Sequence, residues 1–335
     1  MTLTVHQLQL SPAQSRAAQR VNAGMVRAPR LKLGGWRLAV GMRLNGVISA
    51  AAGRMTAAAL KRRGVSVSSE VIPGPGGPLP LRLLLPTGLP RALVVDLHGG
   101  GWVFGSAALN DRLTGHLAEA GLAVASVDYR LLDEARGVWL PDAVADCAAT
   151  LRWGIGEGRT RFGVDRVFVI GESAGAHLAA LALQRLRDDG LGPLPAPVFV
   201  QGVFDLAGSP SVRAADARTL LFDGPNLMRD LGRLTPERDE AGRRAPDVSP
   251  LYGDLSGMPP ALFITGEADP LRDDSRLMAE RWSAHADTVL LEVPLAPHGF
   301  QHFVAASAAP AQAFIRRWIE QGLTGERVSV ENATR

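Results

Sequence analysis

The chain has 335 residues, 46% of them hydrophobic and 21% charged, so it is long enough to bury the core of one large globular domain. Its net charge is only +3, yet its pI is about 9.6. All of its 36 basic side chains except Lys32 and Lys61 are arginine, which stays protonated far above neutral pH, so a small positive charge is enough to give a high pI. Aromatic residues make up 5%, and no basic stripe is interleaved with them, which argues against a nucleic-acid partner.

The N-terminal part of the chain predicts helices. Residues 1–62 are rich in Ala and Arg, and the first 20 lack the basic start and apolar centre of a secretory signal. The apolar stretch 38–60 is interrupted by Arg43, Asn45 and Arg54, so it does not read as an integral membrane segment. Its spacing fits an amphipathic helix or helix pair that packs on the body of the protein; association of this surface with lipid is the alternative.

Strands and helices alternate through the rest of the chain. Residues 65–88 predict a hairpin around the Gly/Pro cluster at 73–78. Further strands are predicted at 92–97, 122–129, 166–170, 195–206, 259–265 and 288–293, with helices between them and a last helix at 308–322. This alternation predicts an α/β fold with a mostly parallel central sheet and helices on both faces.

One long insertion divides this pattern. Residues 206–244 are charged and helical in patches but contain no predicted strand. Long connections of this kind usually form lids or binding elements. We therefore expect one α/β domain in two parts, 63–205 and 245–322, and a flexible tail at 323–335.

The stretch VIGESAGAHLAAL, residues 169–181, places a serine on a tight corner between a strand and a helix. Gly171 and Gly175 flank Ser173 at two residues' distance, and their missing Cβ atoms allow strand and helix to approach closely. This pattern is typical of a nucleophile elbow, and an ordinary turn with a surface serine is the alternative.

A second motif, DLHGGGWVFGS at 96–106, directly follows a predicted strand. His98 is followed there by Gly99, Gly100 and Gly101. Unshielded backbone N–H groups at the carboxyl end of a strand are suited to hold the oxyanion of an acyl-transfer intermediate. A plain flexible loop would not explain this position.

A serine nucleophile needs a histidine base, and four histidines follow Ser173 in the chain: His177, His285, His298 and His302. We favour His298, because it lies in the loop after the strand 288–293, at the carboxyl edge of the sheet. We expect His302 one turn into the last helix, His177 against the sheet and His285 at the surface.

The base needs an orienting carboxylate, and the loop after the strand 259–265 offers four: Glu267, Asp269, Asp273 and Asp274. Asp269 is favoured, because it lies between the strand end and Pro270, which restricts the chain direction after it. Asp273 and Asp274 are expected in the first turn of the next helix, where acidic residues favour the helix dipole. Glu267 is the alternative.

Taken together, the motifs resemble the hormone-sensitive-lipase-like branch of the α/β-hydrolase esterases. HGGGW, DYRL, GESAG, PPALFITGEADPLRDDS and HGF follow that family's order over about residues 65–318. The resemblance implies an α/β-hydrolase fold whose helical cap is built from residues 1–62 and 206–244. In one departure, DYRL is followed by LDEARGVWL instead of the family's Ala-Pro-Glu, in a loop at 131–140 that lies near the pocket opening in the family.

The resemblance also implies the site residues. Ser173 would be the nucleophile, His298 the general base and Asp269 its orienting partner. The oxyanion hole would consist of the backbone N–H groups of Gly100, Gly101 and Ala174. His98 would shape the loop and take no part in the triad.

The predicted function is hydrolysis of short- to medium-chain acyl esters through an acyl-enzyme, with no metal or organic cofactor. Alternatives are an amidase, formamidase or acyltransferase with the same triad, and a ligand-binding protein on a hydrolase scaffold. With Cys147 as the only cysteine, no internal disulfide can form, which suits a reducing compartment, and we expect a cytoplasmic location. The family resemblance leaves a homodimer open.

Overall fold

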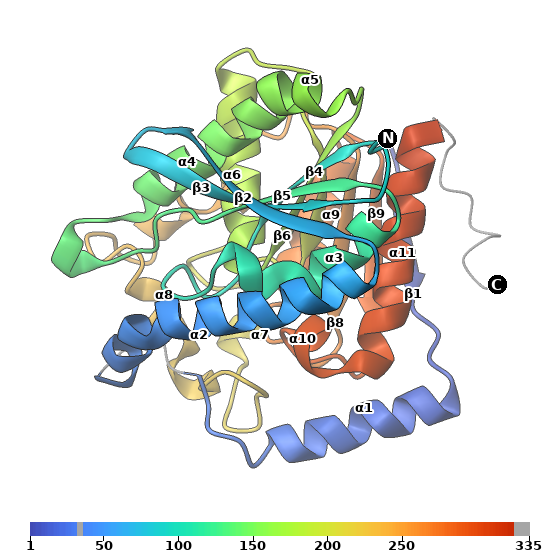
Figure 1. Cartoon of the computed structure of the whole chain (residues 1–335). Helices are drawn as coiled ribbons and strands as arrows, with labels where there is room; N and C mark the ends of the chain where they lie inside the picture. The colour runs from blue at the N-terminus through green and yellow to red at the C-terminus, as the bar shows by residue number, and fades with distance from the viewer. Residues whose placement is uncertain (32–35, 325–335) are drawn as a thin grey trace.

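A nine-stranded sheet forms the centre of the molecule, in the order β1-β9-β8-β7-β6-β4-β5-β3-β2 (Figure 1). The computed structural model describes residues 1–31 and 36–324. The strands are β1 (Leu3–Gln7), β2 (Ser66–Gly74), β3 (Gly77–Leu85), β4 (Leu93–Leu97), β5 (Ala123–Val127), β6 (Val167–Glu172), β7 (Ala196–Val200), β8 (Ala261–Gly266) and β9 (Thr288–Val293). In this spatial order, all neighbouring strands from β1 across the sheet to β5 run parallel. The β2–β3 hairpin lies at the other edge, where β3 pairs antiparallel with β5. The predicted mostly parallel α/β sheet is confirmed.

Helices cover both faces of this sheet. They are α1 (Pro12–Met25), α2 (Trp36–Arg62), α3 (Asp111–Glu119), α4 (Leu140–Trp153), α5 (Arg159–Phe162), α6 (Ala174–Asp188), α7 (Pro210–Arg213), α8 (Leu227–Gly232), α9 (Arg272–Ser283), α10 (Phe300–Phe303) and α11 (Ala305–Thr324). One apolar core lies between the sheet and α4, α6 and α9, and a second lies between the sheet and α3 and α11. Strands β4 and β5 are buried along their whole length, as expected for the middle of a covered parallel sheet.

The register of the central strands brings two motifs of the sequence together. Leu97, the last residue of β4, pairs with Gly171 of β6. The glycine loop after β4 and the serine corner after β6 therefore leave the sheet side by side. Both lie at the carboxyl edge of the parallel strands, where open α/β sheets bind their ligands.

Two predicted elements differ from the structure. Residues 1–62 were expected to be helical, but Leu3–Gln7 form the edge strand β1, which pairs in parallel with β9. The strand is short and half-exposed, so its apolar pattern is weak beside the Ala- and Arg-rich helices that follow. The strand expected at 195–206 ends at Val200, because Gln201 has a φ of 50° and turns the chain out of the sheet.

The first two helices lie in different places. Helix α1 begins with a capping box, in which Ser11 Oγ accepts from Gln14 N at 3.3 Å and Gln14 Oε1 accepts from Ser11 N at 2.8 Å. Helix α1 packs against α11, at the lower edge of Figure 1. Helix α2 lies across the front of the molecule, over the carboxyl edge of the sheet. No helix in the described ranges is long and apolar enough to span a bilayer.

The insertion at 206–244 contains only the short helices α7 and α8 and single turns, in agreement with the prediction of helical patches without strands. It is tied to the N-terminal segment through Leu31, whose N–H donates to Leu221 O at 2.6 Å and whose carbonyl accepts from Asp223 N at 3.1 Å. The predicted tail, 323–335, lies outside the described residues from residue 325 onward.

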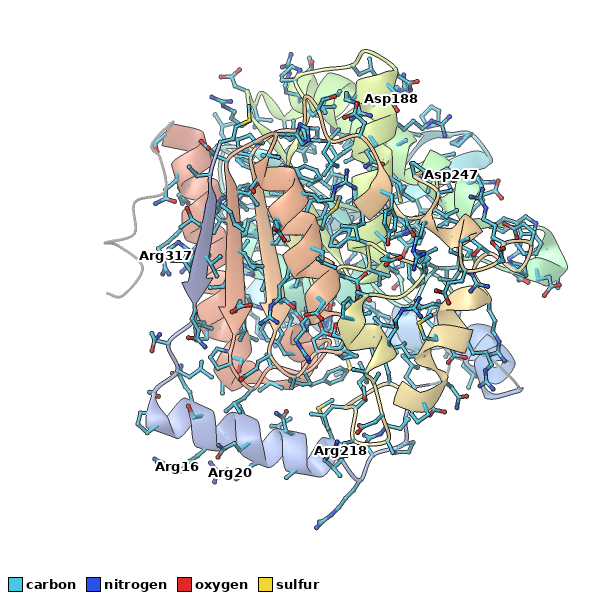
Figure 2. All side chains as sticks on the ribbon, turned by 180° about the vertical axis from the view of Figure 1, so that it is seen from behind. Arg16, Arg20, Asp188, Arg218, Asp247 and Arg317 are labelled. Carbon is cyan, nitrogen blue, oxygen red and sulfur yellow. The ribbon has the colours of Figure 1, made fainter. Side chains whose placement is uncertain are left out.

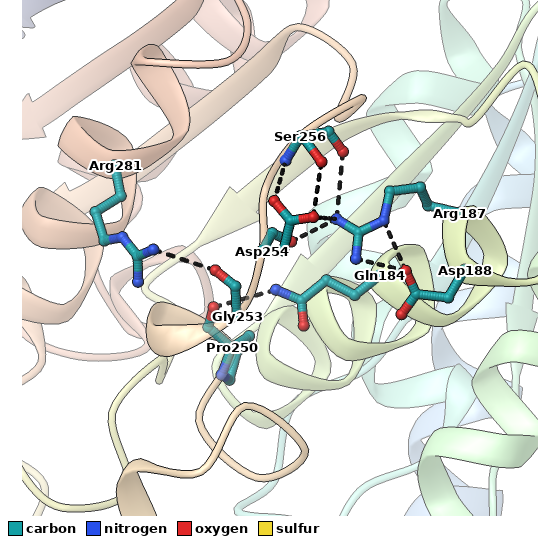
Figure 3. A network of polar contacts seen from close by, with 8 residues as sticks. All are labelled: Gln184, Arg187, Asp188, Pro250, Gly253, Asp254, Ser256 and Arg281. Carbon is teal, nitrogen blue, oxygen red and sulfur yellow. Dashed lines mark hydrogen bonds and ion pairs between the residues drawn. The ribbon is translucent and has the colours of Figure 1, made fainter.

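The chain that follows the insertion is fastened to the far end of α6 (Figure 3). Gln184 Nε2 donates to Pro250 O at 3.1 Å, and Arg187 Nη1 donates to Ser256 O at 3.2 Å. Because these residues lie at the opposite end of α6 from the serine corner, they fix the insertion's return path without touching the site.

The close contact between α6 and β4 predicts that Gly175 tolerates no side chain. A Cβ atom there would lie 1.9 Å from the carbonyl oxygen of Leu97. We expect Gly175→Ala to lower the free energy of unfolding by about 3 kcal/mol, the upper end for overpacked cores. Thermal denaturation measures this, with Gly24→Ala in α1 as the control, because no atom lies within 4 Å of a Cβ at that position. Equal melting temperatures for the two variants would contradict the contact.

Candidate active site

Ser173 occupies a strained corner between β6 and α6. Its φ of 53° and ψ of −117° lie outside the regions that L-residues normally adopt. A Cβ atom on Gly171 would lie 2.6 Å from Gly175 O, so both glycines of the motif are required by close backbone approach. The corner is held by the Ser173 N–H, which donates to Val200 O at 2.9 Å. Strain of this kind is stored where it positions a functional group.

The structure brings together the three residues predicted as a triad. Ser173 Oγ lies 2.9 Å from Nε2 of His298, and Nδ1 of that ring lies 3.1 Å from each carboxylate oxygen of Asp269. All three side chains are buried. Phe222 from the insertion packs on the imidazole, with 4.8 Å between ring centroids. This arrangement can deliver a proton from the serine hydroxyl to the ring.

Gln201 connects the loops that carry the base and the acid, and the sequence analysis did not identify it. Its Nε2 donates to Asp269 Oδ2 at 2.6 Å and to Pro297 O at 3.0 Å, while its Oε1 accepts from Gly299 N at 2.8 Å. Gln201 is fully buried. It thus holds both sides of the Asp269–His298 pair. A single polar residue in the apolar run PAPVFVQGVF was the only sequence signal.

The glycine loop lies against the serine. A Cβ on Gly99 would lie 3.5 Å from Ser173 Cβ, so the loop and the elbow are in van der Waals range. Gly100 and Gly101 have φ values of 122° and 60°, which favour glycine. Among the described residues, no acceptor hydrogen-bonds to the N–H groups of these two glycines. They and the first residue of α6, Ala174, are the donors predicted for the oxyanion hole.

Contacts with Tyr129 and with helix α2 hold the glycine loop in place. His98 stacks on Tyr129 with ring centroids 4.3 Å apart, and the Tyr129 hydroxyl donates to the carbonyl of His98 at 2.8 Å. Asn45 of α2 accepts from Gly105 N at 3.0 Å and donates to its carbonyl at 2.9 Å. The conformation of the glycine loop is therefore fixed by side-chain contacts, two of which come from α2.

A cavity of about 480 Å³ opens over these residues. Its floor contains Ser173, His298 and the glycine loop, and its walls come from α2, the insertion and α10. The apolar residues that line the cavity are Leu31, Ala52, Met55, Phe104, Ala108, Leu109, Leu221, Phe222 and Phe303. Both stretches predicted as a cap, 1–62 and 206–244, therefore contribute to the pocket.

A second ionisable pair lies beside the nucleophile. His302 Nε2 lies 2.7 Å from Glu172 Oε2, and both residues line the pocket. The charge of Glu172 raises the pKa of His302, in spite of its burial and the charge of Arg112. Burial alone would raise the pKa of Glu172, but His302 outweighs it, so that the pKa of this carboxyl is lowered. His302 was predicted one turn into the last helix; it lies instead in the separate short helix α10.

The other candidate histidines lie outside the triad. His177 is buried against the sheet as predicted, where its Nδ1 accepts from Trp102 Nε1 at 3.1 Å and its Nε2 contacts Val248 O at 2.8 Å. Burial lowers the pKa of His177 to about 4, so the ring is neutral. His285 follows α9 and is half-exposed at the surface.

The remaining acidic candidates also have other partners. Glu267 Oε2 accepts from Leu295 N at 3.0 Å, away from the imidazole. Asp273 and Asp274 lie in the first turn of α9, as predicted. Asp274 is fully buried and accepts from Phe204 N at 2.7 Å, and burial raises its pKa to about 7.

The unusual loop at 131–140 does not line the pocket. The resemblance had placed it near the pocket opening. Its contact with the site is indirect, because Leu132 N donates to the carbonyl of Trp102, which follows the glycine loop, at 2.9 Å. The loop therefore supports the glycine loop from outside.

Comparison with known proteins agrees with this geometry. Residues 94–302 match the sequence profile of the family described as alpha/beta hydrolase fold. The carboxylesterase NlhH of Mycobacterium tuberculosis is 36% identical over 66% of this chain and 70% of its own. An acetyl esterase of Salmonella paratyphi B is 31% identical over 70% of this chain and 72% of its own. The crystal structure of the esterase LipW from Mycobacterium marinum superposes with a TM-score of 0.78, at 28% identity over 92% of this chain and 95% of its own.

The Gln201 contacts predict a catalytic defect that is separate from stability. In Gln201→Leu, Asp269 loses a donor and the 297–299 loop loses two hydrogen bonds. We expect kcat on an ester substrate to fall about 10- to 100-fold, with KM little changed because Gln201 does not line the pocket. Gln184→Leu is the matched control, because this buried glutamine also donates to a carbonyl but lies at the far end of α6. A similar loss of kcat in both variants would contradict a positioning role.

The His302–Glu172 pair predicts a pH-dependent contribution to stability. Because the folded-state pKa of His302 is raised above 6.5, its contribution is complete below pH 6.5 and is lost as the pH rises through the folded value. The lowered pKa of Glu172 keeps the pair ionised down to below pH 4.5. Urea unfolding of the wild type and His302→Gln should therefore differ more at pH 5.5 than at pH 9. A difference that is larger at pH 9 would contradict the assignment, and His285→Gln serves as the control.

Proposed function

Because the chain belongs to the alpha/beta hydrolase fold family and is an ester-hydrolysing enzyme, we propose that Ser173, His298 and Asp269 catalyse the hydrolysis of short- to medium-chain acyl esters. The observation that carries this proposal is the chain of hydrogen bonds from Ser173 Oγ through the imidazole of His298 to Asp269. It lies at the floor of a mostly apolar cavity of about 480 Å³. The HGGGW and GESAG motifs and the similarity to carboxylesterases support an esterase of the hormone-sensitive-lipase-like type.

In the proposed mechanism, Nε2 of His298 takes the proton of Ser173 Oγ as the oxygen attacks the acyl carbon. Asp269 accepts from Nδ1–H and stabilises the imidazolium that forms. The carbonyl oxygen becomes an oxyanion, which the N–H groups of Gly100, Gly101 and Ala174 bind; each well-aimed donor is worth about 3 kcal/mol of the barrier. The imidazolium then protonates the leaving alcohol, and water, activated by the same ring, releases the acid.

The cap that we propose over the site consists of α2, Leu31 and the insertion at 206–244. Its two parts are joined by the hydrogen bonds of Leu31 to Leu221 and Asp223. Phe222 and Met55 place apolar surface over the nucleophile, which suits the acyl chain of an ester. The cytoplasmic location, the homodimer and the domain boundaries at 63–205 and 245–322 stay predictions.

A series of p-nitrophenyl esters from acetate to palmitate tests the proposed function. We expect kcat/KM to be highest for short or medium chains, because the acyl chain and the p-nitrophenyl group must share a cavity of about 480 Å³. Ser173→Ala should lower kcat/KM by about 10³-fold or more, since the attacking oxygen is lost. Undiminished turnover in Ser173→Ala would contradict the assignment. Turnover of matched anilides but of no ester would indicate an amidase.

A further inference from the structure

The charges of this chain are distributed unevenly along the sequence. The first 69 residues contain eleven arginines and lysines and no aspartate or glutamate. Since the whole chain has 36 basic and 33 acidic residues, the remaining 266 have 25 basic and 33 acidic ones. A positively charged N-terminal segment therefore lies on a negatively charged body. Such an asymmetry points to an anionic partner for the segment.

Much of this positive charge is exposed and unpaired. Within residues 1–69, the exposed basic residues that form no ion pair with any described carboxylate are Arg16, Arg20, Arg27, Arg54, Lys61 and Arg62. Arg16 and Arg20 lie on α1 at the lower edge of the molecule (Figure 2). Arg63, in contrast, pairs with Glu119 at 3.0 Å. The unpaired side chains are free to meet an external anion.

Helix α2 is inverted relative to an ordinary surface helix. Polar and small residues of one face bind the body: Asn45 bonds Gly105, Thr56 bonds Asp111, and the carbonyl of Gly53 accepts from Arg82. The opposite face carries a row of exposed apolar residues at helical spacing: Leu44, Val47, Ile48, Ala51, Met55 and Ala58. Surface helices normally turn the apolar face inward. The exposed apolar residues of α2 therefore indicate a surface that a partner covers when the protein functions.

This apolar row continues to the opening of the active-site cavity. Met55 is 75% exposed and Phe303 of α10 is 54% exposed, yet both line the cavity. On α2, Arg54 directly precedes Met55, and Arg62 lies two turns after Met55 on the same side of the helix. Apolar and basic side chains thus extend along the outer face of α2 from the pocket entrance.

We propose that the outer face of α2, with the basic residues beside it, docks the enzyme on an anionic lipid surface, so that ester substrates enter the cavity from that surface. An interfacial helix of this type buries aliphatic side chains in the headgroup region while arginines contact lipid phosphates. The inference rests on the proposed ester hydrolysis. A second copy of this chain fits the face poorly, because two N-terminal segments that each carry eleven basic and no acidic residues would repel each other.

Flotation of the full chain with vesicles tests the docking. We expect binding to phosphatidylglycerol vesicles at 50 mM salt, loss of most binding at 500 mM salt, and little binding to phosphatidylcholine. Arg54→Glu with Arg62→Glu should weaken the partition coefficient by more than about tenfold, since each basic residue near the surface contributes a factor of about five. Val47→Ser with Ile48→Ser should weaken it by a similar factor.

Matched controls lie at the amino end of the sheet and on α6. Leu89, 93% exposed before β4, and Arg185, exposed on α6, match the tested residues in type but not in position. Leu89→Ser and Arg185→Glu should bind vesicles like the wild type. Equal binding to both lipids, absence of binding, or equal losses in tested and control variants would overturn the proposal. A concentration-dependent dimer that Val47→Ser abolishes would instead assign the face to a second copy.

Hydrolysis of dissolved p-nitrophenyl butyrate separates the two proposals. Val47, Ile48, Arg54 and Arg62 do not line the cavity, so all variants should keep the wild-type rate on the dissolved ester while losing rate on a vesicle-embedded ester. Vesicle binding without hydrolysis of either ester would contradict the proposed function and leave the docking intact. Hydrolysis of both esters at unchanged rates in every variant would contradict the docking alone.

Discussion

The contact between the start of α6 and the end of β4 is the constraint on which the rest of the site depends. Gly175 and the carbonyl of Leu97 are so close that not even a methyl group fits between them. That distance lets Ser173 project from the sheet at a φ of 53° and brings the glycine loop into van der Waals range of the same serine. This backbone packing contact therefore places the proposed nucleophile beside the proposed oxyanion donors.

The energetic cost of this corner is offset by groups around it. A buried polar side chain is stable only when its hydrogen bonds are satisfied, and Gln201 satisfies its own while it fixes both Asp269 and the 297–299 loop. The Glu172–His302 ion pair fills the neighbouring polar space. From outside, Asn45 connects α2 to the glycine loop. The same helix that presents apolar residues to solvent thus braces the catalytic loop from its inner face.

The sequence predicted what is encoded locally. His98 and Ser173 follow directly on a strand, and Asp269 and His298 lie three and five residues after one, so strand prediction and residue type were enough to bring them to one edge. Gln201 and the His302–Glu172 pair depend on contacts between residues 68 to 130 positions apart, which no local pattern shows. Strand β1 was missed because an exposed edge strand of five residues has little apolar signal. The inverted face of α2 appears only when its contacts with the body are known.

If His298 activates Ser173 for nucleophilic attack, an organophosphonate should label this serine, and peptide mapping locates the adduct. We expect a single adduct on the peptide that contains Ser173, formed in the wild type about 10³-fold faster than in His298→Ala. An adduct on another residue, or equal labelling rates with and without the imidazole, would contradict it.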